Sequence, residues 1–417
     1  MSARRSGADR RSDPGGRSQS DRAVTLEHLF AAKEIVVFCG SGGVGKTSVA
    51  AAAALGATVH LGGKVLVLTI DPARRLATAL GLEGLGNRAV RVAPEVLKAA
   101  GVDARGELWA AMLDTKQSWD ELVLRHAADE ETAYRILDNR LYTNLTARFV
   151  QSHDYIAMER LFEIHASGEY DLIVIDTPPT RNAIDFLDAP ARMADFFGGR
   201  LLRWLTLPYR VGGKRGTRMI NVASRPFYQM ADRILGSKFL QDIAEFFLNF
   251  QSMYDGFVTR AKAVERLLHD KRTTFAVVTT LEAAPLHEAE RFCETLVARD
   301  FHLGALILNK TLPDSLRDPD GAAAATACVD DAGVLADALL DPGETPLSDR
   351  DRTARVLRTV GESYRNFSVV AMREAELRAE LALVPDVVAR VPTFSDDISD
   401  VEGLNAMSQY LFNGPPS

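Results

Sequence analysis

The segment from Gly40 to Thr47 constrains the fold of this chain more than any other part of the sequence. It reads Gly-Ser-Gly-Gly-Val-Gly-Lys-Thr, which is the pattern G-x-x-x-x-G-K-[ST]. An apolar run, Ile35–Cys39, precedes it, and an alanine-rich stretch follows it. A strand, a glycine-rich turn and a helix in this order are typical of a phosphate-binding loop. The alternative is a glycine-rich turn that binds no ligand.

The residue types in this segment suit a nucleotide triphosphate. Glycines allow successive backbone amides to point at phosphate oxygens, and the start of the following helix adds its positive dipole end. We expect the Lys46 ammonium to contact the β- and γ-phosphates and the Thr47 hydroxyl to bind Mg²⁺. ATP and Mg²⁺ are therefore the predicted cofactors. The predicted nucleotide-binding residues of the loop are Gly42, Gly43, Val44, Gly45, Lys46, Thr47 and Ser48.

Two aspartates that follow apolar runs are the candidate acids. Asp176 ends the run Leu172–Ile175, and this Walker B pattern predicts a magnesium-side acid, acting directly or through water. Asp71 follows Val65–Ile70 and could orient the attacking water, which together with Lys46 gives two predicted catalytic residues. For each aspartate the alternative is a capping role at the start of a helix.

Short β-branched apolar runs recur along the chain and are typical of buried parallel strands. Helical stretches separate them, so the predicted fold class is α/β: a doubly wound, mostly parallel sheet that forms a P-loop NTPase core. Segments of about residues 93–167 and 190–269 are predicted as a helical insert subdomain, residues 1–23 as a disordered tail, and residues 24–417 as a single domain. The predicted strands are Ile35–Cys39, Val65–Ile70, Leu172–Ile175, Phe275–Thr279, Ala305–Leu308 and Val387–Val391.

Charge, cysteine content and hydropathy exclude several classes of protein. A net charge of -7 argues against broad electrostatic binding to nucleic acid. The three cysteines, Cys39, Cys293 and Cys328, form no C-x-x-C pair, so no zinc or iron–sulfur site is expected. No stretch approaches the roughly 18 apolar residues of a membrane span. The predicted compartment is the cytoplasm, with any membrane attachment made through a partner.

Beyond single motifs, the combination resembles the ArsA-like branch of deviant Walker A ATPases, which includes arsenite-pump ATPases and ATPases that target tail-anchored membrane proteins. The family's loop K-G-G-x-G-K-[ST] stands here as Ser41–Thr47, its first switch D-P-A-x-x-L as Asp71–Leu76, and its second switch D-T-x-P-[TS] as Asp176–Thr180. Further segments are similar to a bacterial, actinobacterial-type branch of anion-transporting ATPases: Leu113–Lys116, Ile136–Tyr142, Tyr155–Leu161 and Asp176–Pro190.

This resemblance implies further roles. Asp71 would polarise the attacking water, Asn309 would contact the nucleotide base, and Pro392 would lie along that base. For Asn309 the alternative is the capping of a turn at a strand end. The family acts as dimers, so the implied partner is a second copy or a paralogue.

The chain departs from the family at Ser41, where the signature lysine is usual. In the family that lysine reaches the nucleotide of the other subunit, and a serine cannot supply the charge. Three explanations remain open. The chain pairs with a lysine-bearing paralogue, an arginine of the switches (Arg74, Arg75 or Arg181) substitutes for the lysine, or the contact is missing and turnover is slow.

The segment of residues 190–269 is rich in aromatic residues and methionine. The resemblance implies that this region holds a hydrophobic helix of a membrane-protein client, and such surfaces suit adaptable binding. The alternative is that these side chains form the insert's own core. The residues concerned are the segment Phe196–Leu207, the basic loop Arg210–Arg218, and Phe239, Leu240, Phe246, Phe247, Phe250, Met253, Tyr254 and Phe257.

The predicted function is that of a Mg²⁺-dependent ATPase whose cycle gates the helical subdomain, either to handle hydrophobic clients or to energise a membrane partner. Two alternatives remain at this point. One is the ATP-binding subunit of an arsenite-type anion efflux pump. The other is a low-turnover regulatory subunit of a heterodimer.

Overall fold

A single eight-stranded sheet organises the molecule. Its strand order is β3-β4-β2-β5-β1-β6-β7-β8, and neighbouring strands are parallel except for β3 with β4. The predicted α/β fold class is thus confirmed. The computed structural model describes residues 25–70, 75–139, 142, 150–177, 187–189, 191–192, 195, 237–340, 349–381 and 385–414. The strands are β1 Ile35–Cys39, β2 Lys64–Thr69, β3 Val90–Arg91, β4 Glu107–Met112, β5 Leu172–Asp176, β6 Thr273–Thr279, β7 Leu303–Thr311 and β8 Val387–Pro392.

All six predicted strands are present, several of them a few residues longer than expected. In β1, Ile35, Val37 and Cys39 face one hydrophobic cluster, whereas Val36 and Phe38 face another on the opposite side of the sheet. Successive strand residues point to opposite faces, so a continuous apolar run requires helices on both faces. The run of five fully buried residues in β1 follows from this double coverage.

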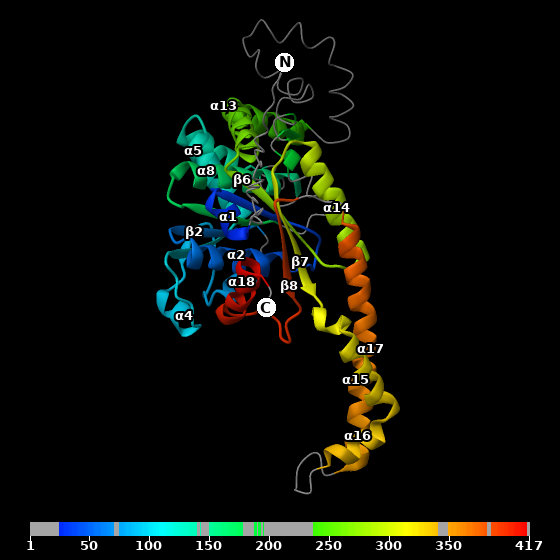
Figure 1. Ribbon diagram of the computed structural model, residues 1–417. Helices are drawn as coiled ribbons and strands as arrows, with labels where there is room; N and C mark the ends of the chain where they lie inside the picture. The colour runs from blue at the N-terminus through cyan, green and yellow to red at the C-terminus, as the bar shows by residue number, and fades with distance from the viewer. Residues whose placement is uncertain are drawn as a thin grey trace, which may run out of the picture.

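Helices cover the two faces of the sheet (Figure 1). Helices α1, α2, α4 and α18 contribute to the cluster on one face, and α5, α6, α8, α13 and α14 contribute to the other. The bounds of these helices and of α3 are α1 Leu26–Ala31, α2 Lys46–His60, α3 Arg75–Ala79, α4 Pro94–Ala99, α5 Thr115–His126, α6 Glu130–Leu137, α8 Val150–Ser167, α13 Ser237–Leu268, α14 Ala283–Ala298 and α18 Val401–Asn413. Among the described residues, no helix is both long and apolar enough to cross a bilayer.

The prediction that residues 93–167 are wholly helical is wrong at β4. Glu107–Met112 forms a strand that pairs in parallel with β2, from Lys64 opposite Glu107 to Thr69 opposite Met112. The sequence Glu-Leu-Trp-Ala-Ala-Met contains good helix formers and no β-branched residue. Pairing with an already buried strand outweighs this local preference, because strand propensity depends strongly on context. The division into a tail of residues 1–23 and one domain stays a prediction, since the tail lies outside the described residues.

The long helix α13 supplies core rather than surface wherever its aromatic side chains are described. Phe246, Phe250, Met253 and Phe257 are each at most 3% exposed and belong to the larger hydrophobic cluster. Phe257 stacks on Phe250 with ring centroids 5.3 Å apart. These four side chains therefore support the core interpretation. The segment Phe196–Leu207 and the basic loop Arg210–Arg218 lie outside the described residues.

A second helical unit extends from the far end of β7. It comprises α15 (Pro319–Asp330), α16 (Ala332–Leu339) and α17 (Arg350–Glu380), which we call the arm, and the short 3-10 helix η1 (Asp314–Arg317) leads into it. Figure 1 shows the arm projecting away from the sheet. Its base is fixed by the Leu312 amide, which donates to a Glu374 carboxylate oxygen at 2.9 Å.

Candidate nucleotide-binding site

The loop between β1 and α2 has the backbone geometry of a phosphate cradle. Gly40, Gly43 and Gly45 have φ values of 151°, 83° and 89°, a region that favours glycine. A Cβ at Gly40 would lie 2.1 Å from the Val278 carbonyl oxygen, and one at Gly45 would lie 2.4 Å from Asn309 Nδ2. Gly42 and Gly43 are exposed, so the turn of the loop is open to a ligand. The predicted loop and its flanking strand and helix are all present.

Lys46 begins α2, with Gly45 as the helix cap. Its side chain is buried, and its Nζ donates to the Ser41 carbonyl oxygen at 2.7 Å. The ammonium group therefore lies across the loop, from the helix start to the beginning of the turn. Because it shares this position with the amide-rich N-terminus of α2, the loop is a region of positive potential.

The two predicted metal-side residues are in contact. The Thr47 hydroxyl donates to Asp176 Oδ2 at 2.7 Å, although the residues are 129 positions apart. The Thr69 hydroxyl, at the end of β2, donates to the same oxygen at 3.0 Å, and Asp176 is fully buried. A hydroxyl and a carboxylate are oxygen donors of the kind that Mg²⁺ prefers, so this pair fits the predicted metal ion.

Asp71, the predicted water-orienting residue, lies outside the described residues. The strand that precedes it, β2, ends beside Asp176. In the pairing of β2 with β5, Thr69 lies opposite Asp176, and the Ile70 amide donates to the Asp176 carbonyl oxygen at 3.0 Å. Ile70, the last described residue before Asp71, thus lies beside Asp176. Of the three switch arginines, Arg75 begins α3 and is exposed, whereas Arg74 and Arg181 lie outside the described residues.

The end of β7 brings Asn309 against the phosphate loop. Its side-chain amide donates to the Val44 carbonyl oxygen at 2.7 Å, and the residue is only 3% exposed. Its Oδ1 has no hydrogen-bond partner in the described part of the chain, which leaves an acceptor at the wall of the loop. Pro392 ends β8, one strand further out, where it lies opposite Thr311 and is half-buried.

Ser41, at the position of the signature lysine, is held within its own chain. Its hydroxyl donates to Glu288 Oε2 at 2.8 Å, and the residue is 7% exposed. Glu288 lies on α14, which packs beside β6. In this structure the position does not face outward. A neutral hydroxyl beside a carboxylate also differs in charge from the lysine of the usual pattern.

Comparison with known proteins is decisive for the family. The model of the ArsA_ATPase family, described as anion-transporting ATPase, matches residues 33–328, which is more than half of the chain. This chain belongs to the ArsA family of ATPases. The resemblance predicted from the loop and the two switches is thereby confirmed.

Several named ArsA relatives are similar at low identity. "ATPase BagA" of Mycobacterium tuberculosis is 24% identical over 385 residues, which are 89% of this chain and 90% of that protein. "Putative arsenical pump-driving ATPase 1" of Aquifex aeolicus is 24% identical over 296 residues, 68% of this chain and 64% of the relative. "ATPase ASNA1 homolog" of Entamoeba dispar is 24% identical over 299 residues, 69% of this chain and 80% of the relative. The match thus covers less than two thirds of the Aquifex protein.

Two of the three thiols of this ArsA-family chain are buried in the core. Cys39 and Cys293 are fully buried in the same hydrophobic cluster, and burial raises the pKa of each to about 12. Cys328 lies on α15 in the arm and is half-buried. Thiolates are the form that binds soft metals and metalloids, so two of the three cysteines are poorly suited to that role at neutral pH.

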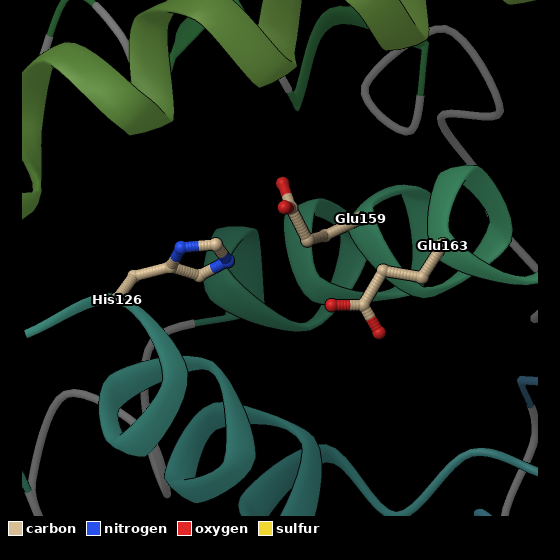
Figure 2. Close-up of side chains that lie close together, drawn as sticks. All are labelled: His126, Glu159 and Glu163. Carbon is tan, nitrogen blue, oxygen red and sulfur yellow. The ribbon is translucent and has the colours of Figure 1, made fainter. Parts of the chain in front are cut away.

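A second polar cluster lies between the helices, away from the loop. Figure 2 shows His126 from α5 facing Glu159 and Glu163 of α8, and their ligand atoms lie within 4.8 Å of one another. Arginines neutralise both carboxylates: Arg260 pairs with Glu159, and Arg125 and Arg160 pair with Glu163. Burial raises the pKa of Glu159, and burial with nearby arginine charges lowers the pKa of His126. The cluster joins α5, α8 and α13 and leaves no excess negative charge for a metal ion.

Three contacting residues were not predicted from the sequence. Thr69 contacts Asp176, Glu288 contacts Ser41, and Lys310 places its Nζ 3.5 Å from the Gly43 carbonyl oxygen. Thr69 could have been found, because it lies two residues before Asp71 at the end of a predicted strand. Glu288 gives no local signal, since it is one of many glutamates on a helix and lies 247 positions from its partner.

Proposed function

We propose that this chain is a Mg²⁺-dependent ATPase whose hydrolysis cycle moves its helical segments against a protein or membrane partner. The observation that carries the proposal is the contact of Thr47 with Asp176 at 2.7 Å, directly beside the Lys46 loop. Membership of an ATPase family supports the same chemistry. The site combines phosphate-binding amides, one ammonium group and a buried oxygen-donor pair, which is the set that phosphoryl transfer to water needs.

Each residue of the site has a distinct role in binding or hydrolysing ATP. The loop amides and Lys46 hold the phosphates, and the charge of Lys46 stabilises the negative charge that develops in the transition state. Thr47 and Asp176 hold the Mg²⁺, which supplies further charge neutralisation when bound. Asp71 orients the attacking water in line with the leaving oxygen. Asn309, through its Oδ1, and Pro392 contact the base. Hydrolysis resets Asp71–Leu76 and Asp176–Asn182, and the helical segments follow.

The proposed partner is a hydrophobic or membrane-protein client, and the active form is a dimer in the cytoplasm, either of two copies or with a lysine-bearing paralogue. The relative named as an ASNA1 homolog and those named as arsenical pump-driving ATPases support a partner at the membrane. Because Phe246, Phe250, Met253 and Phe257 of α13 are buried in the core, a client surface would lie on other residues. An arsenite-type pump subunit is the second candidate, favoured by the relatives' names but not by the two buried thiols.

Phosphate release by the purified chain tests the chemistry. We expect Asp176→Asn and Asp71→Asn each to lower kcat by about 100-fold or more, since each removes a group that acts on the metal or the water. Asp176→Asn should also raise the Mg²⁺ concentration at half-maximal rate. Asp330→Asn, which changes an exposed carboxylate at the end of α15, is the matched control. Wild-type rates in either site variant would refute the assignment.

Purification with native partners separates the alternatives. Co-purification of proteins with apolar helices supports the client proposal, whereas stimulation of hydrolysis by arsenite or related anions supports the pump subunit. ATP binding without turnover, restored by a lysine-bearing paralogue, supports the regulatory subunit. A Ser41→Lys variant with unchanged turnover would show that the missing lysine does not limit the rate.

A further inference from the structure

Strand β7 is irregular at the point where it reaches the phosphate loop. Its register against β8 shifts between Leu308 and Thr311. The two residues in between, Asn309 and Lys310, lie opposite a single residue of β8. An extra residue of this kind is a β-bulge, which bends the strand and re-aims its side chains.

The backbone of Lys310 has a conformation that suits glycine rather than lysine. Its φ is 56°, and among the described residues other than glycine only Asp300 also has a positive φ. A side chain in this left-handed region is strained. Lys310 is also the exposed residue of β7, whose other residues are buried. The fold thus holds a lysine side chain, at a conformational cost, where glycine would fit without strain.

The bulge lets two consecutive side chains contact the same loop. In a regular strand, neighbouring side chains point to opposite faces of the sheet. Here the Asn309 amide donates to the Val44 carbonyl oxygen at 2.7 Å. The Lys310 ammonium lies 3.5 Å from the Gly43 carbonyl oxygen. The first contact is short and buried, so it fixes the loop against β7, whereas the second is long and exposed, which makes it a weak hydrogen bond.

The ammonium group of Lys310 has donors to spare for a ligand. Such a group has three donors, and at most one of them is directed at Gly43. In the described part of the chain, Lys310 forms no ion pair with a carboxylate. Its charge lies beside the exposed turn of the loop, which is the part that is open to a ligand.

This ammonium group lies where the middle of a nucleotide would be. In the proposed site the loop holds the phosphates and Asn309 contacts the base, so the sugar and the α-phosphate lie between them. Lys310 follows Asn309 along the chain and reaches the loop at Gly43. We propose that Lys310 binds the ribose and the α-phosphate of the nucleotide through its ammonium group. This role of Lys310 rests on the proposed function, because it requires a nucleotide in this loop.

A contact with this part of the nucleotide changes affinity rather than the chemical step. ATP and ADP share the ribose and the α-phosphate, and neither group reacts when the γ-phosphate is transferred to water. An interaction that is equally strong in the ground state and the transition state lowers KM and leaves kcat unchanged. Lys310 therefore sets how long a nucleotide stays bound, whereas Lys46 acts on the phosphates that react.

Isothermal titration of the full chain with ADP and Mg²⁺ is the first test. We expect Lys310→Met, which keeps the apolar stem and removes the charge, to raise the dissociation constant about tenfold, the loss of one charge-assisted contact. A non-hydrolysable ATP analogue should lose affinity by the same factor, and ADP should dissociate correspondingly faster. The matched control is Lys98→Met, which removes an exposed lysine charge from α4 and should leave both affinities unchanged.

Two further variants separate nucleotide binding from a structural role. Lys310→Gly relieves the strained φ, so urea unfolding should show a stability equal to or above that of the wild type, while affinity falls as in Lys310→Met. Lys310→Arg keeps the charge and should retain affinity to within about threefold. Single-turnover hydrolysis, measured with protein in excess of ATP and above the dissociation constant, should stay within about twofold of the wild-type rate in every variant.

Three results would overturn this role of Lys310. The first is an unchanged affinity for ADP in both Lys310→Met and Lys310→Gly. The second is an equal loss of affinity in Lys98→Met, which would show a general effect of net charge. The third is a lower single-turnover rate at unchanged affinity, which would place the ammonium group on the γ-phosphate. A wild-type chain that binds neither ADP nor the ATP analogue would instead refute the proposed function itself, and the role of Lys310 with it.

Discussion

The nucleotide-binding edge of the sheet and the arm differ in which kinds of side chain they bury. At the sheet edge, large apolar residues are inside, and the polar groups that carry chemistry are buried with partners: Asp176 is fully buried and accepts from two threonine hydroxyls. In the arm, alanine and glycine are inside, and valine and phenylalanine are half-exposed. In the described part of the chain, Asp176 at the sheet edge thus has partners within one chain, whereas several large apolar side chains of the arm are exposed.

Strand β7 is one of two strands that connect these regions, since β8 follows α17 along the chain. Strand β7 carries Asn309 against the loop, and three residues later the Leu312 amide is held by Glu374 of α17. A movement at the loop that displaces β7 would therefore also displace the base of the arm. The difference in packing predicts that changes at the sheet edge abolish chemistry, whereas equivalent changes in the arm alter local stability.

Lys46→Ala is expected to have the largest effect. Removing the ammonium group from the phosphate site should lower kcat for ATP hydrolysis by at least about 100-fold, because Lys46 is the buried cation that spans the loop. Steady-state phosphate release measures this. The control in the arm is Arg350→Ala, which removes an exposed ion pair with Asp337 and should change the rate by less than about twofold. Comparable losses in the two variants would contradict the division between the regions.

Two glycine substitutions test the difference between the sheet edge and the arm through the free energy of unfolding. Gly40→Ala would bring a Cβ to 2.1 Å from a backbone oxygen in the core, at a φ of 151°, and should destabilise the whole fold by about 3 kcal/mol or more. Gly361→Ala meets a backbone oxygen at 2.5 Å in the arm and should cost about 1–3 kcal/mol locally.

Urea unfolding measures the first change, and hydrogen exchange resolved by peptide measures the second. For Gly361→Ala, faster exchange should be confined to α15, α16 and α17. If exchange rises equally in β1 and β5, the arm is not an independent unit of stability.

Thiol reactivity should distinguish the core from the arm. At pH 8, one thiol per chain should react with Ellman's reagent in the native state, and all three should react in denaturant. Cys39 and Cys293 are at most 1% exposed with pKa values raised to about 12, so few thiolates form, whereas Cys328 is half-buried in the arm. A Cys328→Ser variant should show no native reaction. Rapid reaction of two or more thiols would show that the core opens more easily than its packing indicates.

The smallest expected effect is a pH dependence of the free energy of unfolding, which arises at His126 between α5, α8 and α13. Burial, with the charges of Arg260 and Arg125, lowers the pKa of His126 below its ordinary value of 6.5. The unfolded chain then takes up a proton first, so the free energy of unfolding should fall as the pH drops from 6.5 to the pKa in the folded state. His126→Gln should reduce this slope in urea titrations at several pH values. Part of the slope should remain, because burial also lowers the pKa of His302. An unchanged slope would contradict the assignment to His126.

The parts of the site that could be predicted from the sequence depend on short patterns. The apolar run of β1, the glycines of the loop and Lys46 lie within a dozen residues, and hydropathy with turn chemistry is enough to define them. Asp176 could be placed because it ends a second apolar run. Asn309 was predicted from a family resemblance, and the structure brings it to the loop without testing its proposed contact with a base.

The other parts of the fold and of the site were decided by the tertiary structure alone. Strand β4 was missed, because its alanines favour a helix until the edge of β2 is available for pairing. Glu288 meets Ser41 across 247 positions, a contact that no local period encodes. The apolar residues of α17 could be read from the sequence, but only its packing with α15 and α16 shows which of them are exposed in the described part of the chain. The local periodicity and the turn residues of the sequence determine which side chains share one face of a strand or helix. Which of them are buried depends on long-range neighbours, because burial is a property of the assembled layers.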